Sequence, residues 1–151
     1  MRAHTVRTAL ALGALASLLA ATAPVSASAR PQSRPAAPPP PPVLVDCVWH
    51  AQVRPADFVL ACGDGNSRLV SLHWSRWDAR AAVGEGVNMV NDCKPYCAAG
   101  RFHGYRVAVR LDQPHTWKKQ PKLRQYTRMT LTFKDARPER LPQSVTYPLW
   151  S

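Results

Sequence analysis

Apolar and polar residues alternate through most of the chain after residue 42, and a period of two is typical of β-strands. Val107, Val109 and Leu111 share one face of such a run, and arginines and an alanine fill the other. Similar runs lie at residues 45–51, 58–62, 70–74 and 123–134. No segment after residue 42 has helical periodicity. We therefore predict an all-β fold, a small antiparallel sandwich or barrel of about six or seven strands.

Clusters of Gly, Pro, Asn and Asp separate these runs, and such residues favour turns. The clusters are Arg54-Pro55, Gly63-Asp64-Gly65-Asn66, Gly84-Glu85-Gly86, Asn91-Asp92, Gly104 and Gln113-Pro114. We expect the chain to reverse direction at each of them.

Two tryptophans, Trp74 and Trp77, occupy positions of opposite parity on one predicted strand. Trp74 shares a face with Val70 and Leu72, so we expect it in the core. Trp77 is expected at the rim, and the two rings would point the same way only if a bulge intervened.

Strand parity suggests how the first two of four cysteines pair. If residues 45–51 and 58–64 form a hairpin, Cys47 can lie opposite Cys62, with every apolar side chain on one face. The other opposed pairs would be Trp49 with Leu60 and Ala51 with Phe58. We therefore predict a Cys47–Cys62 disulfide, which leaves Cys93 to pair with Cys97.

The Cys93–Cys97 segment is short and contains Pro95. An alternative pairing would have one of these cysteines reach back to the first hairpin. A redox role fits poorly, because three residues separate the cysteines and no βαβ pattern surrounds them. Zinc would need His103 and a further ligand. We expect two structural disulfides, no bound metal and no cofactor.

Residues 1–29 have the pattern of a secretory signal peptide. Two arginines precede an Ala- and Leu-rich run at residues 9–21, and small residues follow Pro24. We expect cleavage after Ala27 or Ala29. The run is shorter than the roughly 20 residues that span a bilayer. The sequence thus predicts a secreted, extracellular protein with no membrane span in its mature form.

A Pro-rich segment, residues 30–42, follows and contains no large apolar side chain. Such composition favours a disordered, extended linker, and a tether through a cell wall is the functional alternative. Residues 43–151 then form one β-domain.

The segment Asn91-Asp92-Cys93-Lys94-Pro95-Tyr96-Cys97-Ala98-Ala99-Gly100 resembles a family of small secreted, disulfide-containing proteins of actinobacteria. Residues 60–66, 72–77 and 102–107 fit the same family. The resemblance covers residues 57–134, and the cysteine-containing segment is its most specific part. It implies no activity, so no catalytic residue follows from it.

The 20 basic and nine acidic residues give a net charge of +11, and removal of Arg2 and Arg7 with the signal peptide leaves +9. Such an excess suits anionic partners: wall polymers, phospholipid head groups or nucleic acid. If strands 105–111 and 123–134 pair, many basic residues and Tyr126 gather on one face. The candidate anion-binding residues are Arg106, Arg110, Lys118, Lys119, Lys122, Arg124, Arg128 and Lys134. The alternative is an ordinary solvated face.

We expect a non-catalytic binding module that contacts anionic cell-wall or extracellular polymers. A small secreted hydrolase or nuclease is one alternative, although no spacing brings two candidate groups together. Its candidate residues would be His50, His73, His103, His115, Asp78, Asp92, Asp112 and Glu85. A protein-inhibitor-like domain that presents the Cys93–Cys97 loop to a protein partner is another.

Overall fold

The structure is a computed structural model that describes residues 39–150. The predicted signal peptide, residues 1–29, and most of the predicted linker, residues 30–42, lie outside the described residues. Within residues 39–150, no helix has the length and apolar character needed to cross a membrane.

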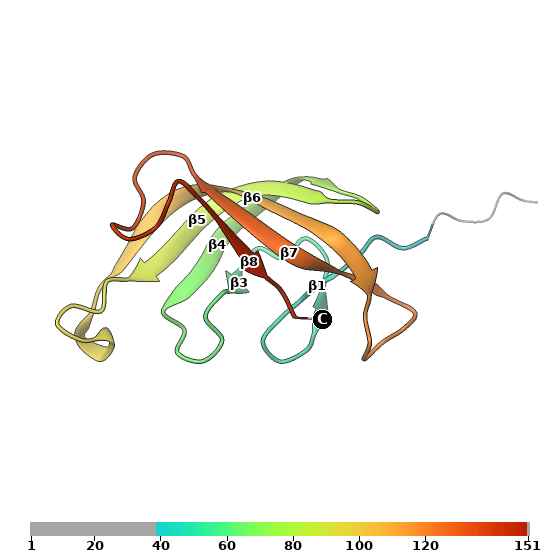
Figure 1. The fold of residues 1–151 in the computed structure, drawn as a ribbon, viewed down its shortest axis with the longest axis horizontal. Helices are drawn as coiled ribbons and strands as arrows, with labels where there is room; N and C mark the ends of the chain where they lie inside the picture. Colours follow the sequence, from blue (N-terminus) through green and yellow to red (C-terminus); the bar gives the residue numbers. More distant parts are fainter. Residues whose placement is uncertain (1–38, 151) are drawn as a thin grey trace, which may run out of the picture. The chain divides into compact units, whose positions relative to one another are not determined.

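Strands make up nearly all of the regular structure in residues 39–150, and one short 3-10 turn, Cys97–Ala99, completes it. The strands are β1 (Leu44–Val45), β2 (Ala51–Gln52), β3 (Phe58–Val59), β4 (Ser67–Trp77), β5 (Ala82–Asn91), β6 (Phe102–Thr116), β7 (Arg124–Phe133) and β8 (Ser144–Pro148). Strands β3 to β8 form one antiparallel sheet in chain order, and β1 pairs with β2. The larger sheet curls into a half-barrel (Figure 1). The predicted all-β antiparallel fold is confirmed.

The segment Pro42–Val45 is bound into the sheet at both of its ends. The indole N–H of Trp77 donates to the Pro42 carbonyl at 2.8 Å, and that of Trp150 donates to the Val45 carbonyl at 2.7 Å. Between them, the amide and the carbonyl of Val43 hydrogen-bond to the β7 backbone at 2.8 and 3.0 Å. Pro42 is buried, so the packed domain begins one residue before the expected boundary.

Strand β1 contributes side chains to two apolar clusters. Leu44 is fully buried in the main core inside the curled sheet. Val43 and Val45 instead pack with the buried Trp117, and Leu123 and Trp150 lie against this second cluster. The main core also contains Phe58, Leu69, Leu72, Trp77, Ala82, Val107, Val109, Leu111, Tyr126, Met129, Leu131 and Phe133.

Both predicted disulfides are present, Cys47–Cys62 and Cys93–Cys97. The hairpin that suggested the first of them, residues 45–51 against 58–64, is nevertheless wrong. Strand β1 pairs with β2, and β3 pairs with β4. Cys47 and Cys62 therefore lie in turns, with their Cα atoms 5.5 Å apart.

The Asp46 side chain explains why the chain reverses earlier than expected. Its carboxylate accepts hydrogen bonds from the Val48 and His50 amides at 3.0 and 2.8 Å, and from the Gln52 side chain at 2.8 Å. Burial alone would raise the pKa of Asp46, but these hydrogen bonds outweigh it and lower the pKa. Asp46 thus closes a turn over residues 46–50, a frequent role of Asp.

The turn expected at Gly84-Glu85-Gly86 is also wrong, because these residues lie within β5. A Cβ atom on Gly84 would lie 2.7 Å from the His73 carbonyl oxygen and 2.9 Å from Trp74 Cε3. A Cβ atom on Gly86 would meet Leu72 Cδ2 at 2.9 Å. The glycines make room for large side chains of β4. The turns expected at Gly104 and Gln113-Pro114 likewise lie inside β6.

Irregular pairing in β4 brings Trp74 and Trp77 together. The β4–β5 register shifts between Trp74 and Arg76, as at a bulge. The two indole rings pack edge to face with their centroids 4.7 Å apart. Trp77 is 7% exposed and belongs to the core, so its expected position at the rim is wrong. Trp74, which was expected in the core, is only half-buried and packs against it.

We predict that Gly84→Ala lowers the free energy of unfolding by about 1–3 kcal/mol, because overpacking forces β4 away from β5. Gly63→Ala is the matched control, since no atom lies within 4 Å of its added Cβ. Urea unfolding followed by tryptophan fluorescence measures both. Equal stability of the two variants would contradict the packing role of Gly84.

We predict that replacing Cys47 and Cys62 together by Ala destabilises the fold by about 3 kcal/mol, and that the Cys93/Cys97 double variant loses about 2 kcal/mol. The reason is loop length, because the first disulfide spans 15 residues and the second spans four. Denaturant unfolding under oxidising conditions compares them. A larger loss in the Cys93/Cys97 variant would refute this ranking.

Candidate functional site

The two basic strands do pair, because β6 and β7 are antiparallel neighbours with Arg110 opposite Thr130. Four of the eight candidate cations lie on these strands or directly after them and form ion pairs. The pairs are Arg106–Asp135 at 2.6 Å, Arg110–Asp112 at 2.9 Å, Arg128–Asp112 at 2.6 Å and Lys134–Glu85 at 2.5 Å. Carboxylates therefore offset much of the positive charge on the sheet face.

Asp112 is the shared partner of two arginines on that face. It is only 9% exposed, and its carboxylate accepts hydrogen bonds from both Arg110 and Arg128. The hydrogen bond from Arg128 lowers the pKa of Asp112; burial opposes this, and Arg110 adds to it. Asp112 is therefore ionised at neutral pH and holds two arginines.

Tyr126 was expected among the basic surface residues, and this is wrong. It is 1% exposed, and its ring packs edge to face on Trp77 at 5.5 Å. Its hydroxyl donates to the carbonyl oxygen of Asp78 at 2.6 Å. Burial, and secondarily the Asp78 charge, raise the pKa of Tyr126 to about 12. Tyr126 stabilises the core and takes no part in a surface site.

The remaining candidates lie at the turn between β6 and β7. Lys118, Lys119 and Lys122 are exposed, and they make no ion pair within residues 39–150. The turn is closed by a hydrogen bond from the buried Trp117 amide to the Leu123 carbonyl at 3.0 Å. Three lysines thus project into solvent from a turn with a fixed base.

Arg124, the eighth candidate, has a structural role. Its guanidinium donates to the carbonyl oxygens of Ala79 and Pro114 at 3.2 and 3.1 Å. It therefore braces the start of β7 against the turn between β4 and β5, although it adds positive charge near the lysines.

An exposed tryptophan contacts this lysine turn. Trp49, in the turn after β1, is 43% exposed and has a φ of 66°, in the left-handed region. The Nζ atom of Lys119 lies 3.8 Å from the centre of the Trp49 ring, within the range of a cation–π interaction. Trp150 packs on Trp49 at 6.4 Å. We call Trp49, Lys118, Lys119 and Lys122 the basic tip.

The sequence pattern missed this role of Trp49 and placed the residue opposite Leu60. The residue that could have indicated this position of Trp49 is Asp46. Its side chain caps a tight turn, and Trp49 lies at the outer end of that turn.

A polar groove of about 540 Å³ adjoins the basic tip. Its lining residues are His115, Thr116, Lys118, Thr127 and Leu149. Gln125 lies opposite His115 in the strand register and is 1% exposed, and its side-chain amide has no hydrogen-bond partner within the described part of the chain. The groove offers ammonium, imidazole and hydroxyl donors, which suit an anionic group.

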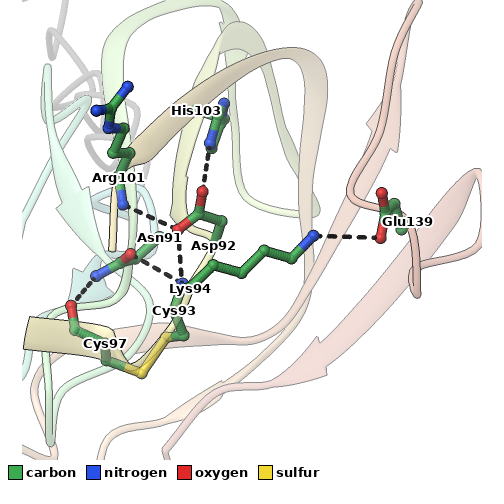
Figure 2. Close-up of polar contacts among 8 residues, drawn as sticks. All are labelled: Asn91, Asp92, Cys93, Lys94, Cys97, Arg101, His103 and Glu139. Atoms are coloured by element: carbon green, nitrogen blue, oxygen red, sulfur yellow. Dashed lines mark hydrogen bonds and ion pairs between the residues drawn. A yellow bond between two sulfur atoms is a disulfide. The ribbon is translucent and has the colours of Figure 1, made fainter. Parts of the chain in front are cut away.

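The catalytic candidates are not assembled into one site. His103 and Asp92 form a close pair, with Nε2 2.9 Å from a carboxylate oxygen (Figure 2). However, Asp92 also accepts the amide hydrogens of Arg101 and Lys94 at 2.9 and 3.1 Å. These hydrogen bonds, that from Arg101 above all, lower the pKa of Asp92. The pair holds a loop in shape.

The other histidines are dispersed. His50 lies 3.6 Å from Asp46, and His73 lies opposite Glu85 on neighbouring strands. A second groove of about 480 Å³ contains His73 and Glu85 together with Arg106 and Lys134, but carboxylates already pair with both of its cations. Residues 39–150 contain no group of three or more His, Cys, Asp or Glu side chains arranged to hold a metal ion.

The Cys93–Cys97 loop presents Tyr96, which is 64% exposed. The Asn91 side chain fixes the loop by donating to the Cys97 carbonyl at 2.8 Å and accepting the Cys93 amide at 3.1 Å (Figure 2). Lys94 lies 3.8 Å from Glu139, and both side chains are mostly exposed.

Comparisons with known proteins add no relative: no family model, curated protein or solved structure matches this chain.

We predict that Asp112→Asn lowers the free energy of unfolding at pH 7 by about 1–2 kcal/mol, because the variant leaves two arginines without their shared carboxylate. The pKa of Asp112 is lowered in the folded state, so its contribution is present above the unfolded pKa of about 4 and is lost as the pH falls through the folded value.

The difference between wild type and variant should therefore shrink in acid, as measured by urea unfolding from pH 7 to about pH 2. Asp135→Asn, which removes an exposed partner of Arg106, serves as the control with a smaller effect. A gap that stays constant with pH would contradict an ionic role of Asp112.

Proposed function

We propose that this chain is a secreted, non-catalytic binding module whose basic tip contacts anionic polymers of the cell wall or the extracellular space. The observation that carries the proposal is the difference between the two groups of cations. Those on the sheet face have carboxylate partners, whereas Lys118, Lys119 and Lys122 have none in residues 39–150. An incoming phosphate or carboxylate therefore meets three ammonium groups on one turn, none of them offset by a carboxylate within residues 39–150.

Export is part of the proposal and has two independent supports. Residues 1–29 carry the pattern of a signal peptide. All four cysteines are paired in disulfides, which persist in oxidising compartments and are rare in the cytosol. Anionic polymers outside the cell are the partners that such a protein would meet.

The arrangement of the tip suits a polymer with repeated charges. Lysine side chains are flexible point charges, so the three ammonium groups can follow phosphate or carboxylate groups of irregular spacing. Trp49 holds the ammonium group of Lys119 near the ring, and the adjoining groove adds donors from His115 and Thr116. Binding through such contacts weakens as salt rises.

The alternatives have less support. For a hydrolase or nuclease, His73 and Glu85 share a groove, but its cations are neutralised by carboxylates. For a protein-inhibitor-like domain, the support is Tyr96 on the disulfide-closed loop.

We predict that replacing Lys118, Lys119 and Lys122 together by Gln weakens binding to soluble polyphosphate by about 100-fold at low salt, since each lost contact is worth about 1 kcal/mol. Fluorescence titration measures the affinity, and raising the salt to about 0.5 M should reduce wild-type binding strongly.

The matched control replaces Lys94, Arg101 and Arg140 by Gln, which removes the same charge without changing the tip. This control should keep most of the wild-type affinity. If both triple variants lost affinity equally, binding would reflect net charge alone and the proposed site would be wrong.

A further inference from the structure

We propose that the tip also docks on anionic phospholipid surfaces, with Val48 and Trp49 entering the headgroup region. This inference rests on the proposed function, because it uses the same three lysines. It is carried by Val48, which is 64% exposed, more than any other large aliphatic side chain in residues 39–150.

Val48 and Trp49 are adjacent at the outer end of the turn over residues 46–50. Asp46, the acidic residue of this turn, directs its carboxylate at the turn amides and the Gln52 side chain. The polar contacts of Asp46 thus close the turn, and Val48, which is mostly exposed, adds nothing to the core. Exposed apolar side chains beside basic residues are a feature of surfaces that bind membranes or proteins.

The apolar and the basic groups project from the same end of the domain. The contact between Trp49 and Lys119 joins the turn after β1 to the turn between β6 and β7. These two loops lie near one another along the lower right of the ribbon, while the Cys93–Cys97 loop lies at the far left (Figure 1). A flat surface could therefore touch the valine, the tryptophan and the lysines together.

The chemistry of this end favours a lipid surface over a further polymer contact. Lys119 covers part of the Trp49 ring, which hinders a sugar from stacking there. Contact with a charged polymer would bury little of the apolar surface of Val48. Entry into a bilayer interface would remove that surface from water, which is favourable in free energy. Tryptophan is enriched at that interface, and each lysine near an anionic leaflet adds binding energy.

The experiment measures cosedimentation of the full chain with phosphatidylcholine vesicles that contain about 30% phosphatidylglycerol, and with pure phosphatidylcholine vesicles. Val48→Ser should weaken binding to the anionic vesicles about fivefold, and the triple lysine variant about 100-fold. Every variant carries the same residues 1–38, so differences between variants report the tip. Circular dichroism confirms that each variant is folded.

Tyr96→Ser is the matched apolar control, because Tyr96 is also 64% exposed but lies on the Cys93–Cys97 loop. It should bind vesicles like the wild type. Val48→Leu, which keeps an apolar side chain, should bind at least as well as the wild type.

Soluble polyphosphate separates the two proposals, because Val48→Ser should leave that binding unchanged. If Val48→Ser bound vesicles like the wild type while the lysine variant lost both ligands, entry of the apolar side chains into the headgroup region would be wrong, because the vesicles would then act only as another anionic polymer. If the lysine variant kept its affinity for polyphosphate, the proposed function itself would fail.

Discussion

The insertion of Pro42–Val45 beside β7 is the constraint on which the rest of the domain depends. Tryptophan N–H groups from β4 and from the end of the described chain donate to the carbonyls of Pro42 and Val45. Because Leu44 faces one cluster and Val43 and Val45 face the other, this short segment completes both. It also sets where the following turn, and hence Trp49, is placed beside the lysines.

The alternation of apolar residues was enough to predict the all-β class, and both predicted disulfides are present. It could not distinguish a glycine in a turn from a glycine in a strand. Gly84 lies within β5 because Trp74 of β4 packs over it, and that contact depends on register, which local sequence does not specify. The Cys47–Cys62 pairing was right although its hairpin was wrong, since turns bring these residues together.

For the candidate site, the sequence supplied the eight cations but not their carboxylate partners. Lys134 pairs with Glu85 of β5, some fifty residues earlier, and such a contact appears only when the sheet is assembled. Asp112 was named from the sequence only as a candidate residue of a hydrolase or nuclease. The sequence did not indicate that this carboxylate would pair with two arginines. The candidate site therefore lies at the turn between β6 and β7 and not on the sheet face. Trp49, from a distant segment of the chain, contacts this turn.

A curled sheet that does not close has two edges, and open edges invite pairing with other chains. Here β3 spans only two residues, the Ala56 carbonyl in the loop before it accepts a hydrogen bond from the Leu72 amide of β4, and β4 itself is irregular. At the opposite edge β8 has five residues and ends at Pro148, which has no N–H to offer. Both edges of the half-barrel thus offer another strand few free backbone groups with which to extend the sheet.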